Sequence, residues 1–257
     1  MLRSHSILLV ILSCVSLVGF LFYRWKTTPV MTGAPPYGEA LEDVPVLPKD
    51  TYGLLNWKRP DGPPRVGLQV GHWKNADLPE ELSQLKGSTG ASGGGFSEWE
   101  VNFAIAEEAA KLLRAQGVTV DILPSTIPPR YWADAFVAIH ADGNLNTSVN
   151  GYKVSSSWRD FTGNADELVS TLEASYAKET QLALDPNISR NMRGYYAFAW
   201  WRYEHAIHPM TTAVIFETGF LSNPSDRKLI AGKPEKAALG LSTGILEYLE
   251  SQNLLSL

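Results

Sequence analysis

Blocks of apolar and polar residues divide the chain into an apolar segment near the N-terminus, a linker and one folded domain. The apolar segment extends from Ile7 to Tyr23, is interrupted only by two serines and a glycine, and has basic residues on both sides. Its length lies between that of a signal peptide's apolar region and that of a full transmembrane helix. The nearest small-residue cleavage site ends at Ala34 and is followed by proline, which disfavours cleavage. We therefore interpret residues 1–26 as an uncleaved signal anchor that crosses the membrane once.

Residues 27–65 read as a linker. They contain eight of the sixteen prolines and show no sustained hydrophobic period. Proline-rich segments of this kind form extended, semi-rigid spacers. This segment is expected to hold the following domain away from a membrane.

Residues 66–257 alternate between short apolar runs and longer stretches with helical periodicity. Such alternation predicts an α/β domain with a mixed, mostly parallel sheet sandwiched between helices. The continuous apolar character of the strands is typical of a sheet covered on both faces. The expected strands are 66–70, 118–123, 135–139, 152–155 and 212–216, and the expected helices are 97–116, 165–184 and 235–249.

Composition narrows the functional classes. With 44% hydrophobic and 19% charged residues, the chain is neither disordered nor a multi-span membrane protein. Its net charge of −5 gives no basic surface for nucleic acid. The single cysteine excludes both an intrachain disulfide and a cysteine-rich zinc site. A metal in this protein must therefore be held by histidines and carboxylates.

Ionisable residues follow three of the predicted strands. His72, His140 and Glu217 each come directly after or close to the end of an apolar run. Active sites of open α/β sheets form outside the carboxyl ends of their strands, so we expect these three side chains at one rim.

A fourth ionisable residue opens the first predicted helix. Ser97 and Glu100 fit a capping box, which gives Glu100 a structural role and leaves Glu98 free in the first turn. Two histidines and a glutamate make the ligand set of a catalytic zinc site, and a second carboxylate could move the proton of a water. Histidines at strand ends are also often structural, and the spacing alone leaves both interpretations open.

Four segments together resemble a known family. They are Val70-Gly71-His72, Glu98 followed by Val101 to Ala106, Phe136 to Asp142, and the Glu-Thr-Gly-Phe-Leu-Ser-Asn stretch that begins at Glu217. In order and spacing they are similar to the zinc-dependent N-acetylmuramoyl-L-alanine amidases of the Amidase_3 type. The resemblance covers nearly all of residues 66–257.

The resemblance implies zinc bound by His72, Glu98 and His140, with Glu217 as the catalytic residue. It implies hydrolysis of the amide that joins the lactyl group of N-acetylmuramic acid to L-alanine in peptidoglycan. A single-pass anchor in the cell membrane, with the domain on the extracytoplasmic side, fits that substrate.

The chain departs from the family's pattern at Trp73, where glycine is frequent, at Ala138, where serine is usual, and at Asp142, where asparagine is common. Asp142 adds a negative charge near the predicted metal. These departures keep two alternatives open: a weakly active or inactive domain that binds peptidoglycan, and a zinc peptidase that cuts within the stem peptide. An aromatic run at 195–201 could stack on sugar rings, but its pattern favours packing. The oligomeric state has no signature in the sequence.

Overall fold

The computed structural model describes residues 54–255. The predicted membrane segment, 1–26, and most of the predicted linker, 27–65, lie outside these residues. Within the described part, no helix combines the length and the apolar character needed to cross a bilayer. The first strand begins at Arg65, one residue before the expected start of the domain.

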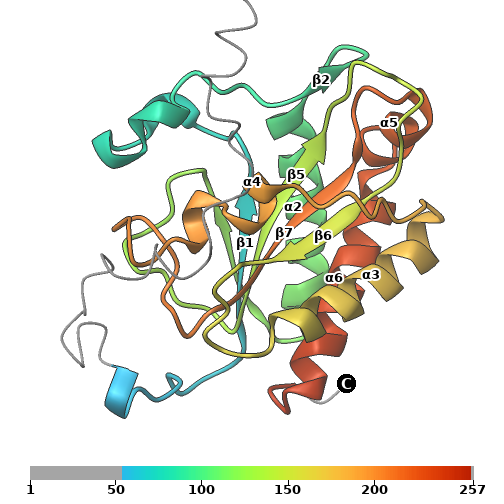
Figure 1. Ribbon diagram of the computed structural model, residues 1–257. Helices are drawn as coiled ribbons and strands as arrows, with labels where there is room; N and C mark the ends of the chain where they lie inside the picture. The colour runs from blue at the N-terminus through green and yellow to red at the C-terminus, as the bar shows by residue number, and fades with distance from the viewer. Residues whose placement is uncertain (1–53, 256–257) are drawn as a thin grey trace, which may run out of the picture. The chain divides into compact units, whose positions relative to one another are not determined.

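The main elements alternate along the chain as the sequence predicts (Figure 1). The strands are β1 (Arg65–Val70), β2 (Ser92–Gly93), β3 (Phe96–Ser97), β4 (Thr119–Leu123), β5 (Ala135–Asp142), β6 (Lys153–Ser156) and β7 (Thr212–Phe220). The α-helices are α2 (Glu98–Ala115), α3 (Ala165–Thr180), α4 (Arg190–Arg193), α5 (Pro224–Ile230) and α6 (Pro234–Ser251). Short 3-10 helices are η2 (Leu54–Asn56), η3 (Asn75–Asp77), η4 (Glu80–Leu85) and η5 (Tyr196–Phe198).

Five strands form one mixed sheet in the order β4-β1-β5-β7-β6. The first four are parallel to one another, and β6 pairs antiparallel with β7 at the edge. The prediction of a mixed, mostly parallel sheet is therefore confirmed. Strands β2 and β3 form a separate small hairpin, which leads directly into α2.

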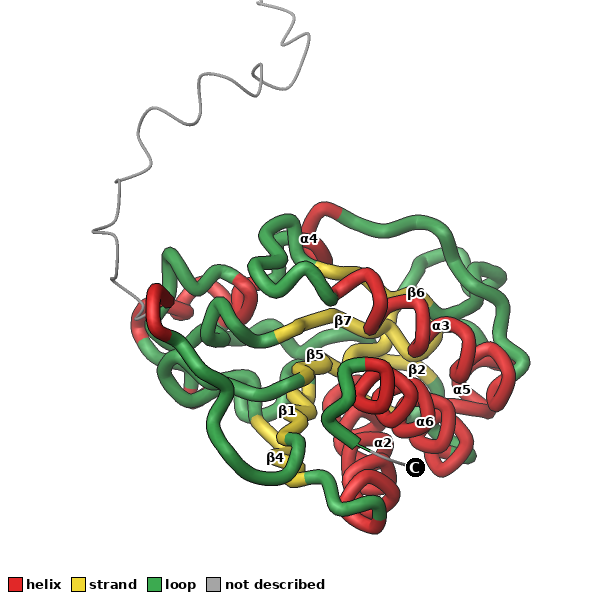
Figure 2. The backbone as a smooth tube through the Cα atoms, turned by 90° about the horizontal axis from the view of Figure 1, so that it is seen from below, coloured by secondary structure: helices red, strands yellow, loops and turns green. Residues whose placement is uncertain are grey.

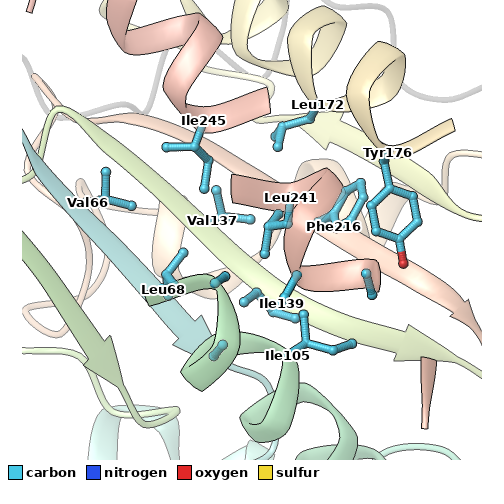
Figure 3. Close-up of a cluster of buried hydrophobic side chains, with 14 of the residues drawn as sticks. Val66, Leu68, Ile105, Val137, Ile139, Leu172, Tyr176, Phe216, Leu241 and Ile245 are labelled. Carbon is cyan, nitrogen blue, oxygen red and sulfur yellow. The ribbon is translucent and has the colours of Figure 1, made fainter. Parts of the chain in front are cut away.

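Helices α2, α3 and α6 cover the first face of the sheet, and Figure 2 shows them together on one side of the strands. Alternate residues of the central strands point into this layer because side chains of a strand alternate between its two faces. Figure 3 shows how these side chains pack between the sheet and the helices. The labelled side chains are all fully buried: Val66, Leu68, Ile105, Val137, Ile139, Leu172, Tyr176, Phe216, Leu241 and Ile245.

The second face is covered mainly by irregular segments with the short helices α4 and η5. A second buried cluster lies between the sheet and these segments. Phe136, Ala138 and Ile215 point into it from the strands, and Ile127 and Phe198 contribute from the covering segments. Helices therefore flank the sheet as expected, but the long helices α2, α3 and α6 all lie on one face and only short ones lie on the other. The loop-covered face carries the site described below.

Two expectations about element ends are wrong. Helix α3 ends at Thr180 instead of 184, because Gln181 adopts a left-handed conformation with φ of 59° that a helix cannot continue through. Strands β5 and β7 extend past their apolar runs, so His140 and Glu217 lie inside the strands instead of following them. The strands continue because their pairing depends on backbone hydrogen bonds and needs no apolar side chains, and this pairing extends to Asp142 and Phe220.

Candidate active site

His140 and Glu217 project from the same face of the sheet. They continue the rows of Phe136 and Ala138 in β5 and of Ile215 in β7, which belong to the loop-covered core. The register pairs His140 with Glu217 directly across the two strands. Lys153 of β6 pairs with Glu217 from the other side. Three ionisable residues therefore lie side by side across the sheet.

His72 reaches the site from the turn after β1. Its backbone has φ of 62°, in the left-handed region where a non-glycine residue is uncommon. Its Nδ1 lies 3.1 Å from the carbonyl oxygen of Ser88, which also accepts a hydrogen bond from the Asn75 amide at 2.7 Å. The Nδ1 side of the ring is therefore held by the backbone, and Nε2 faces Glu98.

Glu98 is the first residue of α2, and its side chain is buried. Its carboxylate accepts hydrogen bonds from the backbone N–H groups of Ala91 at 2.6 Å and Ala141 at 3.1 Å. The predicted division of roles in the first turn is confirmed: the Glu100 carboxylate accepts the Ser97 N–H at 3.2 Å, and Glu98 turns inward.

The structure brings His72, Glu98 and His140 together, with one donor atom of each within 4.8 Å of the others. The two glutamate oxygens lie 3.5 Å from His72 Nε2 and 2.9 Å from His140 Nδ1. In a tetrahedral zinc site with bonds of about 2.0–2.1 Å, two ligand atoms are separated by about 3.3 Å. The spacing and the chemistry of the three donors thus fit zinc.

Two glycines make room for this cluster. A Cβ on Gly71 would lie 2.5 Å from the ring of His140. A Cβ on Gly90 would lie 2.3 Å from the Glu98 carboxylate, and Gly90 also has a positive φ of 73°. Any larger residue at either position would displace a candidate ligand.

The three groups shift one another's ionisation. Burial lowers the pKa of His72. Burial alone would also lower the pKa of His140, but the hydrogen bond and the charge of Glu98 outweigh it and raise that pKa. Burial would raise the pKa of Glu98, and the hydrogen bond from His140 reverses this and lowers it. Glu98 is therefore an anion between two imidazoles, which is the state that a metal ligand needs.

Glu217 lies beside the cluster in the same cavity. The cavity has a volume of about 280 Å³ and is lined by His72, Ala91, Glu98, His140, Ala141, Asp142, Gly143 and Glu217. Burial raises the pKa of Glu217 to about 8, with further upward contributions from the charges of Glu98 and Asp142. Its Oε2 is buried and has no hydrogen-bond partner among the described residues. A carboxylate with this pKa and an uncommitted oxygen is suited to take up and release a proton near neutral pH.

The negative charge of Asp142 is offset by a lysine that sequence reasoning did not find. Lys153 Nζ lies 2.7 Å from Asp142 and 2.9 Å from Asp185, and only 8% of its side chain is exposed. Of the three departures from the family pattern, only Asp142 lines the cavity. Trp73 packs on Phe103 with ring centroids 4.9 Å apart, and Ala138 is buried in the core.

Tyr195 is a second residue that the sequence did not identify. Its hydroxyl lies 3.1 Å from Nε2 of His140. The aromatic run was expected to pack, and Phe198 does so with 1% of its surface exposed. No local pattern distinguishes Tyr195 from its neighbours, because the contact with His140 spans 55 positions of sequence.

The fold and the cluster define an α/β protein with a candidate His-Glu-His metal centre on the loop-covered face of its sheet. The family model described as N-acetylmuramoyl-L-alanine amidase matches residues 66–247. The chain belongs to this family. All four residues singled out from the sequence lie within the matched range.

Individual relatives agree with this assignment. The chain is 29% identical over 174 residues to the N-acetylmuramoyl-L-alanine amidase LytC of Bacillus subtilis (strain 168), a match that covers 62% of this chain and 33% of that protein. The chain therefore spans about a third of the length of this curated relative.

Among solved structures, the amidase Ami1 of Mycobacterium smegmatis has a TM-score of 0.54 at 20% identity, covering 73% of this chain and 97% of that one. The CwlD amidase of Clostridioides difficile, solved in complex with the GerS lipoprotein, has a TM-score of 0.53 at 19% identity, covering 73% and 99%. At these identities the likeness concerns the fold.

Proposed function

We propose that this protein is a zinc-dependent hydrolase that cleaves the amide between N-acetylmuramic acid and L-alanine in peptidoglycan. The observation that carries the proposal is the cavity in which His72, Glu98 and His140 converge beside the carboxylate of Glu217, whose pKa is raised by burial. The family to which the chain belongs supports the choice of bond.

His72, Glu98 and His140 would hold the zinc ion. The chemistry that zinc would supply there is Lewis acidity, which would polarise the scissile carbonyl and make water more acidic. Glu217 takes the proton of the attacking water and transfers it to the amide nitrogen that leaves with L-alanine. The hydrogen bonds from Ala91 and Ala141 fix the Glu98 carboxylate, so that the donor set is arranged before the ion binds.

The proposal extends to the N-terminal segment. Residues 1–26 anchor the protein in the cell membrane, residues 27–65 act as a spacer, and the domain from residue 66 onward lies on the extracytoplasmic side, where peptidoglycan is found. This part rests on the apolar run from Ile7 to Tyr23. Protease added to intact spheroplasts should degrade the domain and leave cytoplasmic proteins intact, whereas protection of the domain would contradict this orientation.

The activity is tested by digesting purified peptidoglycan with the full-length chain and identifying the products by mass spectrometry. We expect free peptides that begin with L-alanine, with product formation lost on chelation and restored by zinc. Glu217→Gln should reduce the rate by about 10²–10⁴-fold, the usual contribution of general acid–base catalysis. The exposed Glu235 of α6 provides a matched control, and Glu235→Gln should retain full activity.

The other outcomes distinguish the alternatives. Peptides that begin with a different residue would assign a peptidase acting within the stem peptide. Tight binding of wall fragments without product, in a chain that binds zinc, would assign a peptidoglycan-binding domain. A Glu217→Gln variant with unchanged turnover would show that the catalytic assignment is wrong.

A further inference from the structure

The two ring nitrogens of His140 face different surroundings. Nδ1 lies 2.9 Å from Glu98, on the side of the candidate metal ligands. Nε2 lies 3.1 Å from the hydroxyl of Tyr195, and the two rings meet edge to face with centroids 5.3 Å apart. Only Nδ1 is therefore directed at the position that a shared metal ion would occupy.

Metal binding through Nδ1 determines where the imidazole proton must be. A neutral histidine carries one proton, and the nitrogen that binds a metal must be the one without it. His140 must then carry its proton on Nε2. Because His140 is buried, an unpaired N–H at that position would be costly.

We propose that Tyr195 is a positioning residue for the metal centre: its hydroxyl accepts the Nε2 proton of His140 and so keeps Nδ1 available to zinc. The inference deepens the proposed function and rests on its metal site. His72 has a corresponding arrangement with the nitrogens exchanged, since its Nδ1 faces the Ser88 carbonyl and its Nε2 faces Glu98. Both histidines are thus held at the nitrogen that points away from Glu98.

The second core holds the Tyr195 hydroxyl in place. The Tyr195 ring packs against Tyr196 and Phe198 with centroid distances of 4.6 and 5.5 Å. Tyr196 is itself fixed, because its hydroxyl bonds to the Ser125 carbonyl and accepts a hydrogen bond from Gln69 at 2.8 Å. Replacing Tyr195 by phenylalanine keeps these ring contacts and removes only the hydroxyl.

A tyrosine elsewhere in the same core offers a control. Tyr195→Phe and Tyr131→Phe each remove one hydroxyl from the loop-covered core, but the Tyr195 hydroxyl is hydrogen-bonded to His140, whereas the Tyr131 hydroxyl donates to Asp121. Zinc affinity of the full-length chain is measured by competition with a chromogenic chelator. Loss of a hydrogen bond behind a ligand typically weakens metal binding by about 10–100-fold. We expect that loss for Tyr195→Phe and a change below about threefold for Tyr131→Phe, in line with the small effect of groups that do not touch the ligands.

The zinc-affinity measurement separates this inference from the catalytic proposal, because it does not depend on turnover. Equal affinities for Tyr195→Phe and the wild-type chain would overturn the role of Tyr195 and leave the zinc site intact. A wild-type chain that binds no zinc would overturn both. Equal weakening by both tyrosine variants would show a general packing effect and also overturn the inference.

The position of the proton provides a second readout that needs no variant. The chain has five histidines, so the spectrum of the ¹⁵N-histidine-labelled, zinc-loaded protein is simple enough to assign by single replacements. We expect His140 to carry a slowly exchanging proton on Nε2, and we expect that signal to disappear by solvent exchange in Tyr195→Phe and to remain in Tyr131→Phe. A proton on Nδ1 in the zinc-loaded wild-type protein would refute the inference.

Discussion

Replacing Lys153 by methionine should destabilise the fold strongly at neutral pH. The ammonium group of Lys153 lies between the carboxylates of Asp142 and Asp185 at 2.7 and 2.9 Å. The Lys153→Met variant keeps much of the aliphatic volume but leaves two carboxylates facing each other without their cation. The variant therefore tests the ion pairs more than the packing.

The burial of the three groups sets the magnitude. Removing one partner of a buried ion pair costs about 3–5 kcal/mol, because the remaining charge is left without compensation. Asp185 and Lys153 are 7% and 8% exposed, but 30% of the Asp142 side chain is open to solvent, which screens its share of the loss. We therefore expect a decrease of about 2–4 kcal/mol in the free energy of unfolding.

The loss should depend on pH with a definite sign. Burial alone would raise the pKa of Asp185, but hydrogen bonds from Lys153 and Asn187 outweigh it and lower that pKa below its ordinary range. A carboxylate with a lowered pKa in the folded state adds stability that is complete above its unfolded pKa of about 3.9 and disappears as the pH falls through the folded value. The difference between the wild-type chain and Lys153→Met should therefore be largest near neutral pH and shrink in acid.

Urea unfolding of the metal-free full-length chain, measured from neutral to acidic pH, gives both quantities. Lys111→Met is the matched control, because Lys111 forms a solvent-exposed ion pair with Glu108 on α2, and its loss should change stability little. A second variant, Lys153→Met with Asp185→Asn, should recover part of the stability by removing one uncompensated charge. A loss below about 1 kcal/mol, or one that does not change with pH, would refute this account of the Lys153 ion pairs.

Three further predictions concern the site and the core. Gly71→Ala should weaken zinc binding by at least tenfold in a chelator competition, because the new Cβ would displace the His140 ring; an unchanged affinity would contradict the proposed crowding. Metal-free Glu217→Gln should be more stable than the wild-type chain at pH 9, and the difference should shrink as the pH falls and disappear only below the unfolded glutamate pKa of about 4.3. Because the Glu217 pKa is raised to about 8, ionising this residue destabilises the folded wild-type chain relative to its unfolded state. Equal urea midpoints of the two chains at pH 9 would contradict this prediction. Ile245→Ala in the fully buried helix layer should cost about 2–5 kcal/mol in urea unfolding without changing zinc affinity, and an effect on affinity would show that the two faces of the sheet are coupled.

The residues that the sequence identified share one property: each stands next to a strong local pattern. His72, His140 and Glu217 interrupt or follow apolar strands, and Glu98 lies in the first turn of a helix with a recognisable capping box. The apolar runs gave the strands but not their ends, since backbone pairing continues through His140 and Glu217. Periodicity therefore located the candidate ligands along the chain and misjudged their place within the strands.

The residues that the sequence missed act over long distances. Lys153 begins β6, a short edge strand with a weak pattern, and its partner Asp185 follows the end of α3. Tyr195 lies in an irregular segment of the loop-covered face, where no hydrophobic period is expected. Hydrogen bonds and ion pairs between such segments depend on how the chain returns across the sheet, which no local spacing encodes.

The row of residues across the sheet explains why Asp142 is compatible with an intact site. From β5 to β6 the row contains His140, Glu217 and Lys153, so the lysine lies next to Glu217 as well as within reach of Asp142. Without Lys153, the charge of Asp142 would add fully to that of Glu98 in raising the pKa of Glu217. With Lys153 in place, the lysine charge lowers the Glu217 pKa and so offsets part of the rise that Asp142 causes. Asp142 and Lys153 therefore act as one electrostatic unit, and the negative charge expected to disturb the metal site is partly compensated within it.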